Sequence, residues 1–169
     1  MNIVITGGAG FLGSRLARAL LAQGRFSVNG QAAQNIVRIT LVDQFQPAAD
    51  LLADPRVSAC VGDLNTLLTP NAQGVAALPA GTDVVYHLAA AVSAECEADF
   101  DLGLRSNLAA TQALFAACRA MGNRPLVVFA SSLAVYGLPA EAPAPSGPWV
   151  VSDDTLPTPQ TSYGIQKFI

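Results

Sequence analysis

The chain has 169 residues, of which 51% are hydrophobic and 12% are charged, and its formal net charge is −3. A disordered chain would hold fewer apolar and more charged residues, and this acidic balance argues against a nucleic-acid surface. Mean hydropathy is +0.40, yet no uncharged apolar run reaches the roughly 18 residues of a membrane span. We therefore expect one globular domain over residues 1–169, since domains run to roughly 100–200 residues.

The predicted elements alternate between short apolar strands and helices. The strands are predicted at residues 2–6, 36–42, 56–61, 83–88 and 126–130. Apolar residues recur with helical spacing in three further segments, which are predicted as helices at 11–23, 100–121 and 161–169. Residues 25–35 are predicted to form a polar loop, and 138–159 contains six prolines and is predicted to be irregular.

This alternation predicts an α/β fold, namely a Rossmann-type doubly wound parallel sheet with helices on both faces. Ligands of such sheets bind at the carboxyl ends of the strands. Glycine and polar residues follow the predicted strand ends at Gly7, Asp43, Asp63, Ser131 and Ser132. We therefore expect the functional site at that edge of the sheet.

Glycines 7, 10 and 13 follow the first strand and open the first helix. A Cβ in this turn would keep a pyrophosphate from the backbone, and the N–H groups at a helix start attract anions. In this context the pattern favours a dinucleotide over the alternative, a purely structural turn. Asp63 and Leu64 follow the third strand and could contact adenine, although aspartate is also common in turns.

Asp43 ends the second strand, where a carboxylate would bind the adenosine ribose and repel a 2′-phosphate, which favours NAD over NADP. Asp43 stands 30 positions after Gly13, whereas the usual spacing is about 20. The loop at 25–35 accounts for the additional residues. The alternative interpretation of Asp43 is a solvated turn residue.

His87, the only histidine, is expected to be a core residue whose hydrogen bonds are satisfied, whereas Glu95 and Glu97 are expected to be solvated loop acids.

Lys167 is the only lysine and stands four residues after Tyr163, so a helix would place both on one face. A fixed ammonium favours a neighbouring phenolate, which can take a hydroxyl proton while hydride leaves the same carbon. A hydroxyl at the end of the fifth strand, Ser131 or Ser132, could bind the same substrate oxygen. Taken alone, a Tyr–Lys pair at this spacing usually marks a solvated helix face. The catalytic interpretation of the pair therefore depends on the glycine loop that precedes it.

Together these segments resemble the extended short-chain dehydrogenase/reductase superfamily, which includes NAD-dependent nucleotide-sugar epimerases and dehydratases. The resemblance is carried by residues 6–13, 62–64, 87–90, 107, 131–137 and 163–167. Within the superfamily, the loop at 25–35 and the stretch 158–167 look most like the D-erythronate dehydrogenase group. Members of that group oxidise a four-carbon sugar acid at C2 with NAD.

The resemblance implies a role for each matching residue. The pyrophosphate would be held by Gly7, Gly10, Phe11, Leu12 and Gly13. Asp43 would bind ribose, Asp63 and Leu64 would bind adenine, and the dinucleotide path would be lined by Leu88, Ala89 and Ala90. Ser132 matches the catalytic serine, with the cofactor-facing Ser131 beside it. Tyr163 would be the acid/base, Lys167 would bind the nicotinamide ribose and tune Tyr163, and Asn107 would support the active-site helix and its water.

Other features of the sequence indicate where the protein is located and what it binds. Cys60, Cys96 and Cys118 match no zinc or disulfide pattern, so we expect buried thiols and no metal site. The N-terminus lacks a signal peptide's basic flank, which predicts a cytoplasmic protein. Members of the family run to about 300 residues, so a substrate domain would follow, and we expect an isolated 1–169 piece to be inactive. The resemblance also implies a homodimer.

Three functions stay open at this point. The first is an NAD-dependent dehydrogenase acting on a small sugar acid. The second is a nucleotide-sugar epimerase or dehydratase that retains its NAD, and the third is a non-catalytic dinucleotide-binding protein. Net release of NADH would separate the first from the second.

Overall fold

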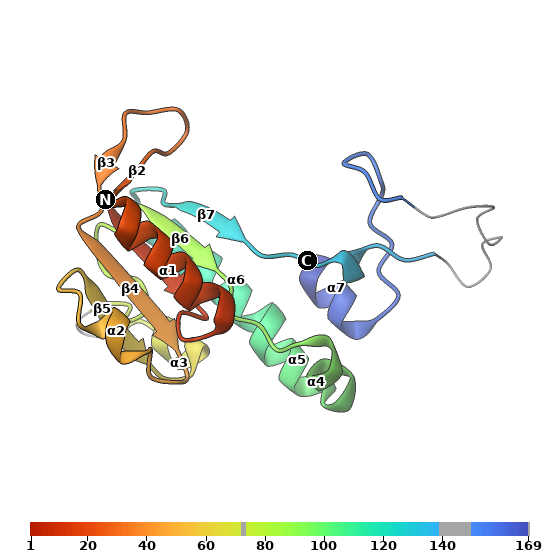
Figure 1. Ribbon diagram of the computed structural model, residues 1–169. Helices are drawn as coiled ribbons and strands as arrows, with labels where there is room; N and C mark the ends of the chain where they lie inside the picture. Colours follow the sequence, from red (N-terminus) through yellow and green to blue (C-terminus); the bar gives the residue numbers. More distant parts are fainter. Residues whose placement is uncertain (72–73, 139–149, 169) are drawn as a thin grey trace. The chain divides into compact units, whose positions relative to one another are not determined.

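The computed structural model describes residues 1–71, 74–138 and 150–168. Its central feature is a five-stranded parallel sheet with the order β5-β4-β1-β6-β7 (Figure 1). The strands are β1 (Asn2–Thr6), β4 (Arg38–Asp43), β5 (Val57–Val61), β6 (Val84–His87) and β7 (Leu126–Phe129). The chain reverses its direction of winding at β1, which confirms the predicted doubly wound, Rossmann-type fold.

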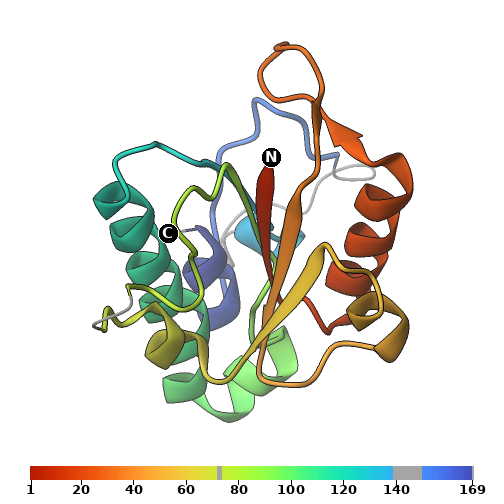
Figure 2. The same ribbon diagram turned by 90° about the vertical axis from the view of Figure 1, so that its left-hand side faces the viewer.

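The chain divides into two compact units, and the sheet lies in the first, residues 1–90 with 109–130. Helices α1 (Phe11–Gln23) and α2 (Ala49–Leu52) cover one face, whereas α3 (Leu64–Leu68) and α6 (Ala110–Ala120) cover the other (Figure 2). Side chains alternate along a strand, so each face has its own core. One core contains Ile3, Ile5, Ala17, Leu20, Leu41 and Leu51, and the other contains Val4, Val42, Leu68, Val85 and Leu114.

Helix α1 has the bounds that the apolar spacing predicts. Its buried residues Gly13, Ala17 and Leu20 repeat every three or four positions and so share the face that meets the sheet. Gly24 ends the helix with a φ of 69°, a left-handed conformation that glycine adopts without a steric penalty. Its N–H donates to the Leu20 carbonyl at 2.9 Å.

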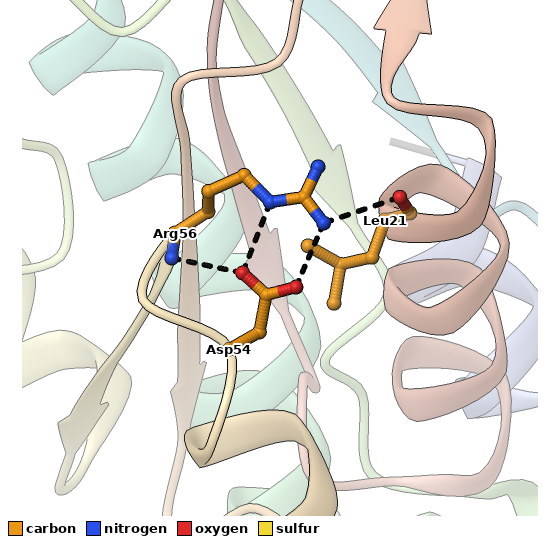
Figure 3. Close-up of polar contacts among 3 residues, drawn as sticks. All are labelled: Leu21, Asp54 and Arg56. Atoms are coloured by element: carbon orange, nitrogen blue, oxygen red, sulfur yellow. Dashed lines mark hydrogen bonds and ion pairs between the residues drawn. The ribbon is translucent and has the colours of Figure 1, made fainter.

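A hydrogen-bonded turn joins the start of β5 to the end of α1 (Figure 3). Arg56 donates from its backbone N–H and Nε to Asp54 Oδ1, and from Nη2 to Asp54 Oδ2 at 2.7 Å. The same Nη2 donates to the Leu21 carbonyl at 3.2 Å. Hydrogen bonds from the Arg56 side chain lower the pKa of Asp54 to about 2. The aspartate therefore stays charged at neutral pH and holds the guanidinium against α1.

The segment predicted as a polar loop contains a short antiparallel hairpin, so that prediction was wrong. Its strands are β2 (Arg25–Phe26) and β3 (Gln34–Asn35). The hairpin is anchored to the sheet, because the N-terminal amine donates to the Asn35 carbonyl at 2.7 Å and Phe26 contacts Tyr86 edge-on. Two-residue strands are too short to show an alternating pattern in the sequence.

The long helix predicted at 100–121 is divided into three elements. These are α5 (Phe100–Gly103), the π-helix η1 (Leu104–Ala109) and α6. The wider turns of a π-helix shift the register of the side chains that follow. Leu114 is fully buried, whereas the next residue, Phe115, is 44% exposed.

The second unit, residues 91–108 with 131–169, contains α4 (Ser93–Ala98), α5, most of η1, the 3-10 helix η2 (Leu133–Val135) and α7 (Ser162–Phe168). Helix α7 packs against α4, α5 and η2. Residues 150–159 form no helix or strand, in line with their prolines, and 139–149 lie outside the described residues.

Two further properties concern the helices of the described residues and the cysteines. Within the described ranges, no helix has both the length and the apolar character that crossing a bilayer requires. All three cysteines are free; Cys96 and Cys118 are buried, and Cys60 is partly buried. Burial raises the pKa of each thiol, so the thiols stay protonated at neutral pH.

Candidate functional site

The glycine loop joins the end of β1 to the start of α1, and its glycines are required by close contacts. Gly7 has a φ of +71°, and its carbonyl accepts the Gly10 N–H at 3.1 Å. A Cβ at Gly13 would lie 2.1 Å from the Gly7 oxygen, and a Cβ at Gly7 would lie 2.9 Å from the Ala89 nitrogen. Side chains at these two positions would therefore force the turn open.

The first turn of α1 offers backbone N–H groups to a ligand. The first N–H groups of a helix have no partner inside the helix, and no side chain caps α1 in the part of the chain that is described. Phe11 is 75% exposed and Leu12 is 63% exposed, so this turn is open to solvent. Donors without a protein acceptor, beside a turn free of Cβ atoms, fit the pyrophosphate of a dinucleotide.

Asp43 ties the end of β4 to this loop. Its Oδ2 accepts the Ala9 N–H at 3.0 Å, and its Oδ1 accepts the Phe45 N–H at 3.1 Å. A carboxylate has about four acceptor positions, so about two remain for donors from a ligand. The contact with Ala9 had no signal in the sequence, because it joins residues 34 positions apart.

Asp63 and Leu64 lie at the end of the neighbouring strand β5. Asp63 Oδ1 accepts the Thr66 N–H at 3.1 Å and so caps α3, whose first residue is Leu64. The backbone of Gly62 donates to the Asp43 carbonyl at 2.9 Å, which places these residues beside Asp43. Asp63 thus has a structural task, and its second oxygen is left for a ligand.

The segment Leu88, Ala89 and Ala90 continues from β6 alongside the glycine loop. Leu88 donates from its N–H to the Thr6 carbonyl, and Ala89 donates to Thr6 Oγ1, both at 3.2 Å. His87 is 1% exposed, with Nδ1 2.7 Å from Thr6 Oγ1 and Nε2 3.0 Å from Thr111 Oγ1. Its prediction as a satisfied core histidine is confirmed.

In the second unit, α7 carries Tyr163 and Lys167 one helical turn apart. The Lys167 side chain is buried, and this burial lowers its pKa. A Cβ at Gly164 would lie 2.2 Å from the Ala134 carbonyl oxygen, so only glycine lets α7 approach η2 this closely. The contact brings the Tyr–Lys helix against the element that Ser132 caps.

The two serines after β7 have different tasks. Ser131 donates from its hydroxyl to the Lys167 carbonyl at 3.0 Å and so fastens the end of α7. Ser132 Oγ accepts the Ala134 N–H at 3.1 Å. A hydroxyl that accepts can still donate, so the Ser132 proton can be directed to a substrate oxygen.

Asn107 lies in η1 and is 2% exposed. Its Oδ1 accepts the Ala91 N–H at 2.9 Å, and its Nδ2 donates to Gln166 Oε1 at 3.0 Å. Gln166 was not singled out in the sequence. The available signal was its position between Tyr163 and Lys167, four residues after Ser162.

Glu95 and Glu97 are exposed to solvent, as predicted, but the prediction that they lie in a loop was wrong. Both lie in α4, where Glu95 Oε2 accepts the Val92 N–H at 3.0 Å. Glu97 Oε1 accepts the Ser162 hydroxyl at 2.8 Å and so holds the start of α7. Among the described residues, no group of three or more His, Cys, Asp or Glu side chains could hold a metal ion.

The candidate residues thus fall into two sets, one in each unit. The first set contains Gly7, Gly10, Phe11, Leu12, Gly13, Asp43, Asp63, Leu64, Leu88, Ala89 and Ala90. The second set contains Asn107, Ser131, Ser132, Tyr163 and Lys167. The first set provides backbone donors and carboxylate acceptors, and the second provides a phenol, an ammonium and a hydroxyl.

Comparisons with known proteins identify the family to which the chain is similar. The model of the NAD dependent epimerase/dehydratase family matches residues 3–169. D-erythronate dehydrogenase from Cupriavidus necator is 47% identical over 169 residues, which are 100% of this chain and 48% of that protein.

Two solved structures are also similar. The nucleoside-diphosphate-sugar epimerase from Agrobacterium tumefaciens has a TM-score of 0.73 and 38% identity, covering 99% of this chain and 46% of that one. MoeE5, in complex with UDP-glucuronic acid and NAD, has a TM-score of 0.72 and 30% identity, with the same coverage. The chain therefore spans about half the length of these relatives.

Proposed function

Because the chain belongs to the NAD dependent epimerase/dehydratase family, we propose that it forms the NAD-binding part of a dehydrogenase for a small sugar acid of the D-erythronate type. The observation that carries this proposal is the buried Lys167 ammonium, one helical turn from Tyr163 on α7. The choice of substrate is supported by 47% identity to a D-erythronate dehydrogenase. We assign residues 1–169 to the first part of a two-domain protein.

The first unit would hold the dinucleotide. The backbone at Gly7, Gly10 and the start of α1 would bind the pyrophosphate, and Asp43 would accept the ribose hydroxyls. Asp63 and Leu64 would contact the adenine, and the dinucleotide would run along Leu88, Ala89 and Ala90. NAD, when bound, supplies the acceptor for hydride. No phosphate ligand is expected at Asp43, because its carboxylate would repel one.

The second unit would handle the proton. Ser132 would donate a hydrogen bond to the reacting oxygen of the substrate and hold the secondary alcohol in place. Tyr163, as phenolate, would take the hydroxyl proton as the alcohol becomes a ketone. Lys167 would stabilise the phenolate through its charge and would hydrogen-bond the nicotinamide ribose. Asn107 and Ser131 would hold α7.

The glycine cradle gives a direct test of dinucleotide binding. Replacing Gly13 with alanine places a Cβ 2.1 Å from the Gly7 oxygen. We expect the full-length variant to bind NAD at least about 100-fold more weakly, as measured by titration calorimetry, because the turn must open. Gln23→Ala, an exposed change on the same helix, is the control. Wild-type affinity in Gly13→Ala would contradict the assigned cradle.

The reaction itself is tested by the fate of the hydride. The full-length protein, mixed with excess NAD and D-erythronate, should release NADH continuously, as measured by absorbance at about 340 nm. A nucleotide-sugar epimerase would instead convert UDP-glucose without net NADH formation. The epimerase is the second candidate, favoured by the 38% identity to the Agrobacterium tumefaciens structure. Epimerisation without NADH release would replace the first proposal with the second.

The proposal extends to assembly and location. Ile165 and Phe168 on α7 are 48% and 55% exposed, and we assign this face to a homodimer contact. Free thiols throughout the chain support a reducing, cytoplasmic location. Light scattering of the full-length protein tests the dimer, and a monomer at micromolar concentration would contradict it.

A further inference from the structure

The amide of Gln166 is buried in the second unit, and one of its ends has no hydrogen-bond partner. Gln166 is 3% exposed, and its Nε2 finds no acceptor among the described residues. A buried donor without a partner costs free energy and needs an explanation. The explanation lies in the hydrogen bonds that fix the direction of the other end.

A backbone donor determines how this amide points. The Ala91 N–H can only donate, so the atom of Asn107 that faces it must be the oxygen, Oδ1, at 2.9 Å. The nitrogen of Asn107 then faces Gln166, and it donates to Oε1 at 3.0 Å. Turning the Gln166 amide over would bring two donors together. The Oε1 contact is therefore maintained although it leaves Nε2 without an acceptor.

The other side of the amide lies against the backbone of α5. A Cβ on Gly103 would lie 2.6 Å from Gln166 Nε2 and 2.7 Å from Oε1, so a larger residue there would displace the amide from this position. Gln166 is thus held between Gly103 and Asn107. Four residues earlier on the same face of α7, Ser162 donates to Glu97 Oε1 at 2.8 Å.

This anchored face lies directly beside the face that carries the proposed chemistry. Ser162 and Gln166 precede Tyr163 and Lys167 by one position each, which is a rotation of about 100° around a helix. Holding Gln166 therefore fixes the rotation of α7 and the directions in which the phenol and the ammonium point. A small rotation of this helix would move both groups together.

We propose that Gln166 is a positioning residue that orients Tyr163 and Lys167 by locking α7 onto Gly103 and Asn107. This inference rests on the proposed function, in which the substrate alcohol is oxidised and Tyr163 takes its proton. Gln166 itself touches no substrate. It acts through the rotation of the helix, so its loss should slow the chemical step more than it weakens the binding of substrate or NAD.

The first experiment compares Gln166→Met with wild type in the full-length protein. Methionine fills a similar volume, but its thioether sulfur is only a weak acceptor for the Asn107 amide. We expect kcat per folded molecule to fall about 10- to 100-fold, because a displacement near 1 Å has that effect, while KM and the NAD affinity stay within about threefold. Gln112→Met, the same change at an exposed position of α6, should leave kcat unchanged.

A double-mutant cycle tests the contact with Gly103. Gly103→Ala pushes a Cβ into the amide and should lower kcat about tenfold. Once Gln166 is alanine, the Cβ has room, so Gly103→Ala should add less than about a twofold loss. Additive losses would overturn the proposed contact.

A measurement without turnover separates this proposal from the proposed reaction. Hydrogen exchange of the α7 amides should be faster in Gln166→Met than in wild type, with the exchange of β1 unchanged. If wild type oxidises no sugar acid, the proposed function fails and the exchange result still decides whether Gln166 locks α7. Unchanged exchange, or a loss of folded protein with wild-type kcat per folded molecule, would overturn the positioning role.

Discussion

Replacing Tyr163 with phenylalanine should lower the rate of NADH formation by about 10²- to 10⁴-fold, the usual contribution of a positioned acid or base. The variant removes one oxygen from α7 and leaves the first unit, with its glycine cradle, unchanged. NAD affinity should therefore stay within about threefold of wild type. Steady-state kinetics measures the first quantity and titration calorimetry the second, both on the full-length protein.

Tyr86 provides a matched control for that substitution. Tyr86 lies in β6, and its ring contacts the Phe26 ring edge-on. Burial raises the pKa of Tyr86, so its phenol stays protonated. Tyr86→Phe removes the same atom and should leave kcat near wild type. If Tyr163→Phe kept full activity, Tyr163 would not be the proton acceptor. If the wild-type protein bound NAD but turned over neither D-erythronate nor a nucleotide sugar, the non-catalytic dinucleotide-binding protein would be favoured.

Replacing Lys167 with methionine should make the protein more stable and nearly inactive. The side chain is 4% exposed, and burial lowers its pKa below the ordinary 10.5. The unfolded chain therefore binds more protons than the folded protein between the two pKa values, and the ammonium destabilises the fold at neutral pH. Methionine has a similar length and no charge. We expect a gain on the order of 1 kcal/mol at pH 7, with kcat lowered at least about 100-fold.

The pH dependence identifies the cause of that gain. The destabilisation by Lys167 is fully present at low pH and disappears as the pH rises through the lowered pKa towards 10.5. The stability difference between variant and wild type should therefore shrink over that window, as measured by urea denaturation. Arg119→Met, which removes an exposed cation at the end of α6, should not stabilise the protein. A destabilised Lys167→Met with normal activity would contradict both assignments.

The sheet and the glycine loop were predictable because their signals are local. The apolar run before Gly7 and the helical spacing after Gly10 lie next to one another in the chain, and they gave β1 and α1 with the observed bounds. The same holds for the position of Asp43 at a strand end and for the buried His87. In each case a short segment contains its own pattern.

The features that were not predictable depend on contacts between distant segments. Gln166 meets Asn107 across 59 positions, and no local pattern distinguishes it from a solvated glutamine. The π-helix at Leu104–Ala109 interrupts a spacing that reads as one continuous helix. Glu97 was assigned to a loop because α4 has only six residues, too few for an apolar period to appear.

The two hydrogen bonds accepted by Asp43 have a consequence for redesigning cofactor preference. Its Oδ2 holds the Ala9 N–H and its Oδ1 holds the Phe45 N–H, so the group that we assign to NAD selectivity also shapes the phosphate turn. Exchanging it for a small neutral residue to admit NADP would release that turn at the same time. Engineering towards NADP has to supply a substitute acceptor for Ala9 before any basic residue is added.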